Sequence, residues 1–426
     1  MHAERIVVTG MGLVSPAGIG QAPLWKAIVE GKTSLRPVAE LATTSARYGF
    51  DPGEYGGYVG APMIEELDAY ASAHDVAMDD GSLFAAQPLI AAREALREAG
   101  LDRDRAGVGL SLGTNFGQLG LLEQLVRRRR ATSLQELAPG MVAAYPFPTV
   151  ARVLTRRFGL RGPSMVFSLA CASSNFALGH AIDLLRTGQA DCMLAGGWEA
   201  IQASGLVGAY RLGVIDPQPC RPFAKDRMGF TPGIGAAFLV LETLRSAVAR
   251  GAEPLAEIAG FGASCDAHHI TSPDPDGHGM ALAMRRAMDD AGMGLEEVDY
   301  INAHGTGTYL NDLIETRAIK RVFGARAHAI PVSSTKSIVG HTAGASAALE
   351  AVICCLAVRR GVVPPTLHHD APDPECDLDY VPNASRRREI GTALSNSFAF
   401  GGNNSTLVVR GVRTSPGSMV GSDGKA

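Results

Sequence analysis

One cysteine and two histidines of this chain each stand in a segment rich in glycine, serine and threonine. Cys171 is the centre of Ser-Leu-Ala-Cys-Ala-Ser-Ser, His304 begins His-Gly-Thr-Gly-Thr, and His341 ends Lys-Ser-Ile-Val-Gly-His. A thiolate can accept an acyl group from a thioester, and two imidazoles can stabilise the charge on a carbonyl oxygen or a departing carboxylate. Together the three segments predict covalent acyl-thioester chemistry.

The three side chains are predicted at junctions between secondary-structure elements. Cys171 follows the apolar run Met165–Phe167 and precedes a helical stretch, so its thiol is expected over the positive end of a helix, with a lowered pKa. His304 ends a predicted strand, and His341 lies at a second strand–helix turn, with Lys336 five residues before it.

A purely structural role is the alternative for any single cysteine or histidine. We keep that interpretation for the other six cysteines and for the adjacent pair His268 and His269. An adjacent pair lacks the helical spacing of a His-Glu-x-x-His zinc site, so no zinc is expected.

The elements that must position these residues alternate between short β-rich runs and longer amphipathic stretches, which is typical of an α/β protein with buried sheets. Strands are predicted at Arg5–Thr9, Val108–Leu112, Ser164–Ser168, Cys192–Ala195, Ala237–Leu241, Ala256–Gly260, Tyr300–Ala303, Pro331–Ser334, Thr392–Leu394 and Ser405–Arg410. Helices are predicted at Pro23–Glu30, Ala85–Ala99, Phe116–Arg129, Phe176–Thr187, Ala281–Ala291, Leu310–Phe323 and Ala343–Val358. The last of these carries hardly a charge, so we expect it to be buried on most sides.

Composition limits the classes of function. A chain of 426 residues is long enough for two domains, and a net charge of −4 argues against a nucleic-acid-binding protein. No basic leader with a long apolar stretch and no membrane-spanning apolar run is found, so no membrane partner is expected. The seven cysteines form no CxxC pair, which favours free thiols and a cytoplasmic location.

The arrangement around Cys171 has a loose echo around Lys336 and His341, which suggests two similar halves. We predict an N-terminal half at 1–251 that carries the cysteine and a C-terminal half at 252–413 that carries both histidines. Residues 414–426 are expected to be a disordered tail.

The three segments, in this order, resemble those of the β-ketoacyl synthases, the condensing enzymes of fatty-acid and polyketide synthesis. The resemblance runs from Val7–Gly12 to Asn404. It implies a thiolase-like fold, in which two similar α/β halves form an α-β-α-β-α layered sandwich. It also implies decarboxylative Claisen condensation of a cysteine-bound acyl group with malonyl-acyl carrier protein, giving 3-oxoacyl-acyl carrier protein. No cofactor is expected beyond the phosphopantetheine arm that the carrier brings.

The resemblance also assigns roles to single residues. Cys171 is the nucleophile, His304 and His341 serve decarboxylation, and Lys336 holds the local charge balance. The backbone N–H groups of Cys171 and Phe400 form the oxyanion hole. The remaining assignments are the pantetheine-binding pair Thr306 and Thr308, the network glutamates Glu315 and Glu350, and a monovalent-cation site at Asn302, Glu315, Glu350, Ser395 and Asn396. Solvated helix faces are the alternative for both glutamates.

Three positions depart from or vary the family pattern. Ala399 replaces the usual glycine before Phe400, which gates acyl access, so the gate is expected to be stiffer. The segment Gly233–Ala237 lacks the usual acidic side chain. Phe116 falls where the family's acyl pocket is lined near the dimer interface, and it should shorten the pocket or act as a movable plug.

A basic run at Arg127–Arg130 and the single Arg211 resemble the residues that dock the acidic acyl carrier protein. The docking prediction names Arg127, Arg128, Arg130 and Arg211. A solvated helix end is the alternative for the run.

Three rivals remain beside the condensing enzyme. A thiolase would carry a second cysteine in the glycine-rich C-terminal loop, and none stands there. A partner subunit of a ketosynthase heterodimer would lack the nucleophile. A non-elongating acyltransferase would not need both histidines. The pathway, the primer length, the cognate carrier, and homodimer against heterodimer are left open.

Overall fold

The computed structural model describes residues 4–41, 57–61, 64–74, 83–101, 105–131, 147–200 and 202–412. Its strands are β1 (Ile6–Ser15), β2 (Gly18–Ile19), β3 (Leu35–Pro37), β4 (Tyr58–Gly60), β5 (Val108–Gly113), β6 (Ser164–Phe167), β7 (Cys192–Glu199), β8 (Gly235–Thr243), β9 (Ala256–Cys265), β10 (Tyr300–Asn302), β11 (Val332–Ser333), β12 (Val362–Val363), β13 (Arg386–Arg387), β14 (Thr392–Ala399) and β15 (Asn403–Arg410). Its α-helices are α1 (Gln21–Glu30), α3 (Ile64–Ala73), α4 (Leu83–Glu98), α5 (Leu119–Ala131), α7 (Thr149–Phe158), α8 (Ser173–Arg186), α9 (Ala203–Arg211), α10 (Leu244–Ala249), α11 (His278–Asp290), α12 (Tyr309–Phe323), α13 (Lys336–Val339) and α14 (Ser346–Arg360). The predicted tail at 414–426 lies outside the described residues.

Two groups of five strands repeat one arrangement. The first runs β1-β8-β7-β5-β6 and the second β9-β15-β14-β10-β11, and in each the first two pairings are antiparallel and the last two parallel. The groups join where Ile6–Val8 of β1 pairs with Ala256–Ile258 of β9. The halves expected from the sequence thus have matching topology, while their exact boundary stays a prediction.

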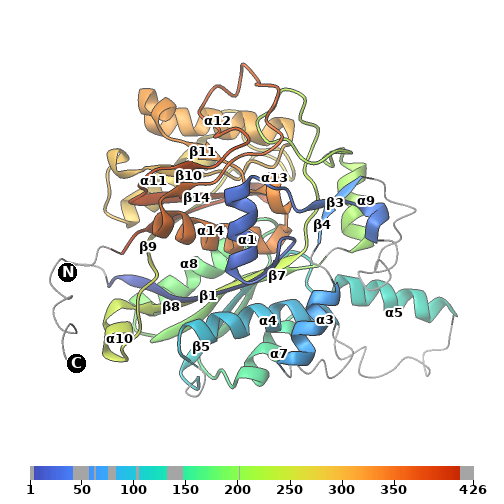
Figure 1. The fold of residues 1–426 in the computed structure, drawn as a ribbon, viewed down its shortest axis with the longest axis vertical. Helices are drawn as coiled ribbons and strands as arrows, with labels where there is room; N and C mark the ends of the chain where they lie inside the picture. The colour runs from blue at the N-terminus through green and yellow to red at the C-terminus, as the bar shows by residue number, and fades with distance from the viewer. Residues whose placement is uncertain are drawn as a thin grey trace, which may run out of the picture.

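Helices separate and cover the two strand groups (Figure 1). Helices α8 and α14 lie between them and contact strands of both, α4 packs on β1, β7 and β8 from outside, and α11 packs on β9 and β15 with α12 beside it. The layers therefore follow the order expected for an α-β-α-β-α sandwich. Helix α14 is buried from Ser346 to Ala357, as its lack of charge predicted.

Glycines allow the outer helices to lie directly on the central strands. A Cβ atom on Gly10 or Gly12 of β1 would stand within about 2.1 Å of a carbonyl oxygen of α4. Gly260 and Gly262 of β9 approach α11 in the same way, at 2.3 and 2.2 Å. Gly10-Met11-Gly12, which is not a dinucleotide fingerprint, thus serves close helix packing in one half, and Gly260 and Gly262 do so in the other.

All ten predicted strands exist, and several extend further than predicted, such as β1 to Ser15. The seven predicted helices also exist, with shifted ends: α14 begins at Ser346, because Ala343–Ala345 form a 3-10 turn, and α8 begins at Ser173. Helices α3, α7, α9, α10 and α13 were not predicted. Within the described residues, no helix is long and apolar enough to span a membrane.

Candidate active site

The thiol of Cys171 stands in a tight turn between β6 and α8. Ala170, just before it, has a φ of 48°, a left-handed conformation that a small residue tolerates best. The Ser173 hydroxyl accepts a hydrogen bond from the Leu169 N–H (2.8 Å) and donates to the Ala170 carbonyl (2.6 Å). Ser397 of β14 donates to the Cys171 carbonyl at 3.1 Å. The turn is therefore held from both halves of the chain.

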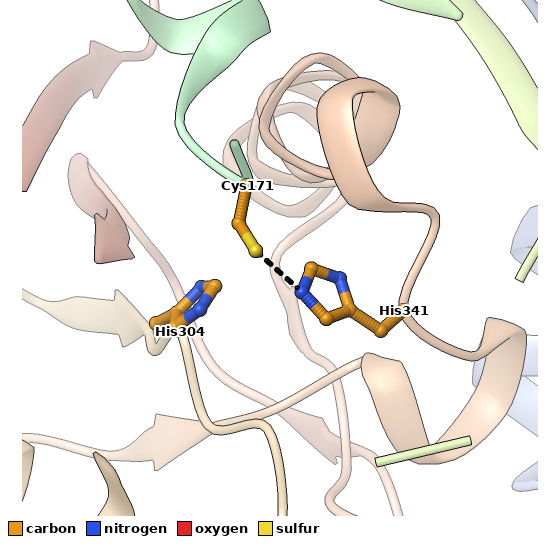
Figure 2. A group of neighbouring side chains, drawn as sticks. All are labelled: Cys171, His304 and His341. Atoms are coloured by element: carbon orange, nitrogen blue, oxygen red, sulfur yellow. Dashed lines mark hydrogen bonds between the residues drawn. The ribbon is translucent and has the colours of Figure 1, made fainter. Parts of the chain in front are cut away.

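His341 contacts the thiol directly. Its Nε2 atom lies 2.9 Å from Cys171 Sγ, as Figure 2 shows, and its Nδ1 atom lies 2.8 Å from the Ser346 hydroxyl. The ring is buried and meets Phe230 edge-on, with 5.2 Å between the ring centroids. The imidazole is thus in position to receive the thiol proton.

His304 lies on the other side of the thiol (Figure 2). Its ring stands almost perpendicular to that of His341, with 5.5 Å between the centroids. Sγ and one ring nitrogen of each histidine all lie within 4.8 Å of one another. Glu315 of α12 holds the strand end, because it accepts the N–H groups of His304 (2.9 Å) and Gly305 (2.8 Å). The structure therefore brings the three predicted catalytic side chains together.

Burial makes the resting site electrically neutral. It raises the pKa of the Cys171 thiol to about 12, with Lys336 opposing the shift. It also lowers the pKa values of His304 and His341 well below their usual range, and the positive charge of Lys336 adds to both shifts. The predicted drop in the Cys171 pKa at the helix end is therefore wrong, since desolvation outweighs it. The resting pair is a thiol beside a neutral imidazole.

Lys336 and Glu350 form an ion pair beneath the site. The exposed fractions of the two side chains are 1% and 3%. Burial raises the pKa of Glu350 to about 7, and Lys336 pulls it down. Glu315 is fully buried as well. Burial raises its pKa to about 7, although the N–H groups that donate to it lower the pKa in part. Solvated helix faces are excluded for both glutamates.

Several of the oxygens predicted to bind a monovalent cation already have partners. Glu315 accepts His304, Gly305 and the Asn396 amide (3.2 Å), while Lys336 occupies one oxygen of Glu350. Asn396 Oδ1 accepts the Thr406 hydroxyl. The Asn302 Oδ1 accepts from Tyr300 and Thr335, at 3.3 and 3.5 Å. No contact brings Glu315 and Glu350 together among the described residues. The second carboxylate oxygen of Glu350, Oε2, is buried and has no hydrogen-bond partner among the described residues. The cation site therefore stays a prediction.

A cavity of about 820 Å³ opens beside the thiol. Cys171, both histidines and the predicted pantetheine-binding pair line it. The hydroxyls of that pair, Thr306 and Thr308, lie 2.8 Å apart. Exposed apolar side chains mark its open end, namely Leu212, Met228, Tyr309 and Phe400. A substrate arm can therefore reach the thiol past the two threonines.

Both predicted pocket phenylalanines line this cavity. The Phe116 ring packs on α9, where a Cβ on Gly205 would come within 3.1 Å of it. Phe400 lies in a 3-10 turn that ends β14 and is 40% exposed. Ala399 has a φ of −126°, an ordinary extended conformation, so its Cβ adds no strain in this state of the loop.

The remaining departure, at Ile234, and the predicted docking arginines lie in different surroundings. Ile234, where the family usually has an acidic residue, is fully buried with Val38 and Val59. Arg211 is exposed at the end of α9, beside the open end of the cavity. The backbones of Arg127, Arg128 and Arg130 lie in α5, but their side chains fall outside the described part.

Four residues that touch the site were not predicted: Glu199, Phe230, Ser346 and Ser397. Ser346 follows His341 by one helical turn, and Ser397 is two residues after Ser395, so both signals were present in the sequence. Glu199 ends β7 and lines the cavity. Its position depends on strand order, which the sequence alone does not reveal.

Known proteins resemble this chain over nearly its whole length. Residues 3–247 match the sequence model of the β-ketoacyl synthase N-terminal domain, and residues 255–370 match that of the C-terminal domain. Nodulation protein E of Rhizobium sp. (strain N33) is 41% identical over 419 residues, covering 96% of this chain and all (100%) of that protein. The 3-oxoacyl-[acyl-carrier-protein] synthase 2 of Synechocystis sp. is 38% identical, with coverages of 96% and 99%.

Solved structures give the same result. A chain of a type II polyketide synthase acyl-carrier protein in complex with its ketosynthase matches with a TM-score of 0.85 and 32% identity, over 97% of this chain and 100% of that one. The ishigamide ketosynthase/chain length factor matches with a TM-score of 0.85 and 34% identity, over 96% and 100%. The fold expected from the sequence is confirmed.

Proposed function

The chain belongs to the β-ketoacyl synthases, acyltransferases that perform condensation in fatty-acid or polyketide biosynthesis, and from that premise we propose how its residues divide the reaction. The observation that carries the proposal is the half-buried thiol of Cys171 between two neutral imidazoles, at the inner end of a cavity open to the surface.

The first half-reaction loads the acyl group. Cys171 Sγ attacks the carbonyl carbon of an acyl-carrier thioester while His341 Nε2, 2.9 Å away, takes the thiol proton. The backbone N–H groups of Cys171 and Phe400 receive the oxyanion. The tetrahedral intermediate then expels the carrier thiolate, which receives the proton from His341.

The second half-reaction makes the carbon–carbon bond. Neutral His304 and His341 each donate an N–H to the thioester oxygen of malonyl-carrier, which stabilises the enolate formed as carbon dioxide leaves. The enolate carbon attacks the acyl carbonyl on Cys171 and expels its sulfur as a thiolate. A proton from solvent restores the thiol, and 3-oxoacyl-carrier departs.

Ser346 lets His341 serve both steps. As a base, the ring needs a bare Nε2 and an Nδ1–H, which donates to the Ser346 hydroxyl. As a donor, the ring needs an Nε2–H and a bare Nδ1, and the Ser346 hydroxyl then donates to Nδ1. A hydroxyl can do either, whereas a carbonyl or carboxylate oxygen can only accept.

The partners follow from the cavity and the relatives. We assign the acyl carrier protein to the face around the cavity mouth, where Arg211 is exposed, with Arg127, Arg128 and Arg130 as further predicted contacts. Two of the solved relatives are complexes, one with an acyl-carrier protein and one with a chain length factor. We propose a pair of chains, either a homodimer or a heterodimer with a sister subunit.

A cytoplasmic location is part of the same proposal. All seven cysteines are free thiols, including the buried neighbours Cys354 and Cys355, which suits a reducing compartment.

Intact-protein mass spectrometry on the full chain tests the function. The enzyme is incubated with acyl-carrier thioesters of several lengths and then with malonyl-carrier, beside Cys171→Ala. We expect an acyl adduct on wild type only, discharged to a 3-oxoacyl carrier with release of carbon dioxide. No adduct with any primer would identify a partner subunit instead. Discharge without carbon dioxide would identify a non-elongating acyltransferase.

A further inference from the structure

The side chain of Glu199 is a buried carboxylate that the mechanism above does not use. It ends β7, is 1% exposed and lines the cavity. Oε2 accepts the N–H groups of Asn115 (2.6 Å) and Gly344 (3.2 Å). Oε1 accepts the N–H of Phe116 and the hydroxyl of Thr114, both at 3.3 Å. One carboxylate thus binds two separate segments of the chain.

The first segment is the pocket loop, Thr114–Gly117, which carries Phe116. Besides Glu199, it is held by Ser168, which donates to the Asn115 carbonyl at 3.1 Å and lies three residues before Cys171. The Phe116 ring closes against Gly205 of α9. The backbone position of this loop therefore determines where the wall of the acyl pocket stands.

The second segment is the turn at Ala343–Ala345, between His341 and Ser346. It lies directly on the pocket loop, since a Cβ on Gly344 would stand 2.4 Å from the Asn115 nitrogen. His341 bonds to Ser346, the first residue after the turn. A shift of the turn must therefore move the imidazole relative to the thiol.

Resting on the proposed function, we propose that Glu199 is a positioning residue that couples the acyl-pocket wall at Phe116 to the catalytic imidazole of His341. With the carboxylate in place, the wall is closed and His341 is aligned. When the carboxylate loses acceptor capacity, the Phe116 N–H loses its partner, the wall loosens, and longer acyl groups enter while malonyl decarboxylation slows.

Protonation and amide substitution should have the same effect. If Oε1 of Glu199 carries a proton, its O–H donates to the Thr114 hydroxyl. The Phe116 N–H then faces a donor in place of an acceptor and loses its hydrogen bond. Glu199→Gln places an NH₂ group in the same position. Burial raises the pKa of Glu199 to about 7 against its four donors, so the change falls in an accessible pH range. The negative charge of Glu199 also raises the pKa of a titratable neighbour, the Cys171 thiol in the turn between β6 and α8.

The experiment measures the ratio of Cys171 acylation rates for a long and a short acyl-carrier primer, from pH 6 to pH 8. The ratio cancels the ionisation of the thiol, which is common to both primers. For wild type we expect the ratio to fall as pH rises through about 7. For Glu199→Gln we expect a ratio roughly tenfold higher than wild type at pH 8, which is the size expected for one lost charge-assisted hydrogen bond. The ratio of this variant should not depend on pH.

Controls separate coupling from loss of stability. Glu242→Gln removes another buried carboxylate, on β8, which bonds Thr9 and Arg250 away from the pocket loop; it should leave the wild-type ratio and its pH dependence intact. Glu199→Asp keeps the charge and should restore the pH dependence in part. If Glu199→Gln fails to fold, a wild-type ratio that does not change between pH 6 and pH 8 still refutes the proposal.

The outcomes also separate this proposal from the function on which it rests. A wild-type enzyme that accepts no primer contradicts the function. A wild-type enzyme that condenses normally, with a Glu199→Gln variant of identical primer ratio and pH profile, contradicts only the coupling.

Discussion

The Nδ1 atom of His341 lies 2.8 Å from the hydroxyl oxygen of Ser346, the first residue of α14, while Nε2 of the same ring faces the Cys171 thiol. The Thr342 hydroxyl lies 3.2 Å from the same serine oxygen. The ring is thus held at both nitrogens: the reactive thiol contacts Nε2, and the Ser346 hydroxyl, which can donate or accept, contacts Nδ1.

Replacing this serine should slow both half-reactions. Ser346→Ala leaves Nδ1 without its hydroxyl, so acylation and condensation should each fall about fivefold, the cost of one buried hydrogen bond. Ser346→Thr keeps the hydroxyl and should retain most activity. Single-turnover mass spectrometry measures each step, and equal rates for Ser346→Ala and wild type would contradict the role.

The two histidines should separate the two half-reactions. Of the two histidines, only His341 hydrogen-bonds the thiol, so His341→Ala should slow acylation by about 10²- to 10⁴-fold. His304→Ala should leave acylation within a few-fold of wild type but abolish discharge of the acyl group by malonyl-carrier. Carbon dioxide release and the mass of the enzyme, followed together, distinguish the variants. Equal acylation defects in both would contradict this division of roles.

The buried ion pair should matter more for stability than any surface pair. Lys336→Met leaves the Glu350 charge uncompensated and should cost about 3–5 kcal/mol in the free energy of unfolding. The double variant Lys336→Met/Glu350→Met should recover part of that loss. Arg386→Ala, which removes an exposed pair with Asp379, is the control and should cost less than about 1 kcal/mol. Urea titrations of the wild type and the three variants give the free energies of unfolding.

Stability should depend on pH through the buried carboxyls. Glu315 holds its proton up to a pH of about 7 in the folded chain but only to its ordinary 4.5 when unfolded. The free energy of unfolding should therefore fall as pH rises between these values, by up to about 3 kcal/mol for this group. The buried imidazoles act oppositely below pH 6.5, because only the unfolded chain protonates them.

Glu315→Gln isolates that contribution. The variant should be less stable overall, because its amide cannot accept both backbone N–H groups. The difference in unfolding free energy between variant and wild type should shrink as pH rises from 5 to 8. A difference that is constant with pH would show that Glu315 is already ionised at the lower pH.

The acyl pocket should lengthen when its wall is removed. Phe116→Ala takes away the ring that packs on Gly205, so primers too long for wild type should acylate Cys171. Val207→Ala, on an exposed side chain of the same helix as Gly205, is the control and should leave the profile unchanged. Undiminished long-chain acylation by wild type itself would contradict the short-pocket prediction.

The catalytic residues were predictable because their motifs are local. Cys171 and His304 follow predicted strands within three residues, and His341 follows one by seven; strand ends converge at one edge of a sheet. Long apolar helices and strands were predictable for the same reason, since periodicity is local. Helices α9 and α13 were missed because each is short, and α9 carries glycine at 205 and 208.

The protonation of the site was not predictable from the sequence. The helix end near Cys171 suggested a lowered thiol pKa, but burial, which depends on the packing of both halves, raises it. Glu199 was missed for a related reason. Its partners at 114–116 and 344 are far away in the chain and meet only through the strand order.

The position of β1 has a consequence for synthesis of the chain. This strand is made long before its two main partners, β8, which ends at Thr243, and β9, which begins at Ala256. Its backbone cannot complete either of these ladders until β8 and β9 have been made. Until then β1 can pair only with β2, at Val14 and Ser15. The largely apolar remainder of β1 must stay protected during that interval, and the sheet of the first half cannot be completed before β8 is made.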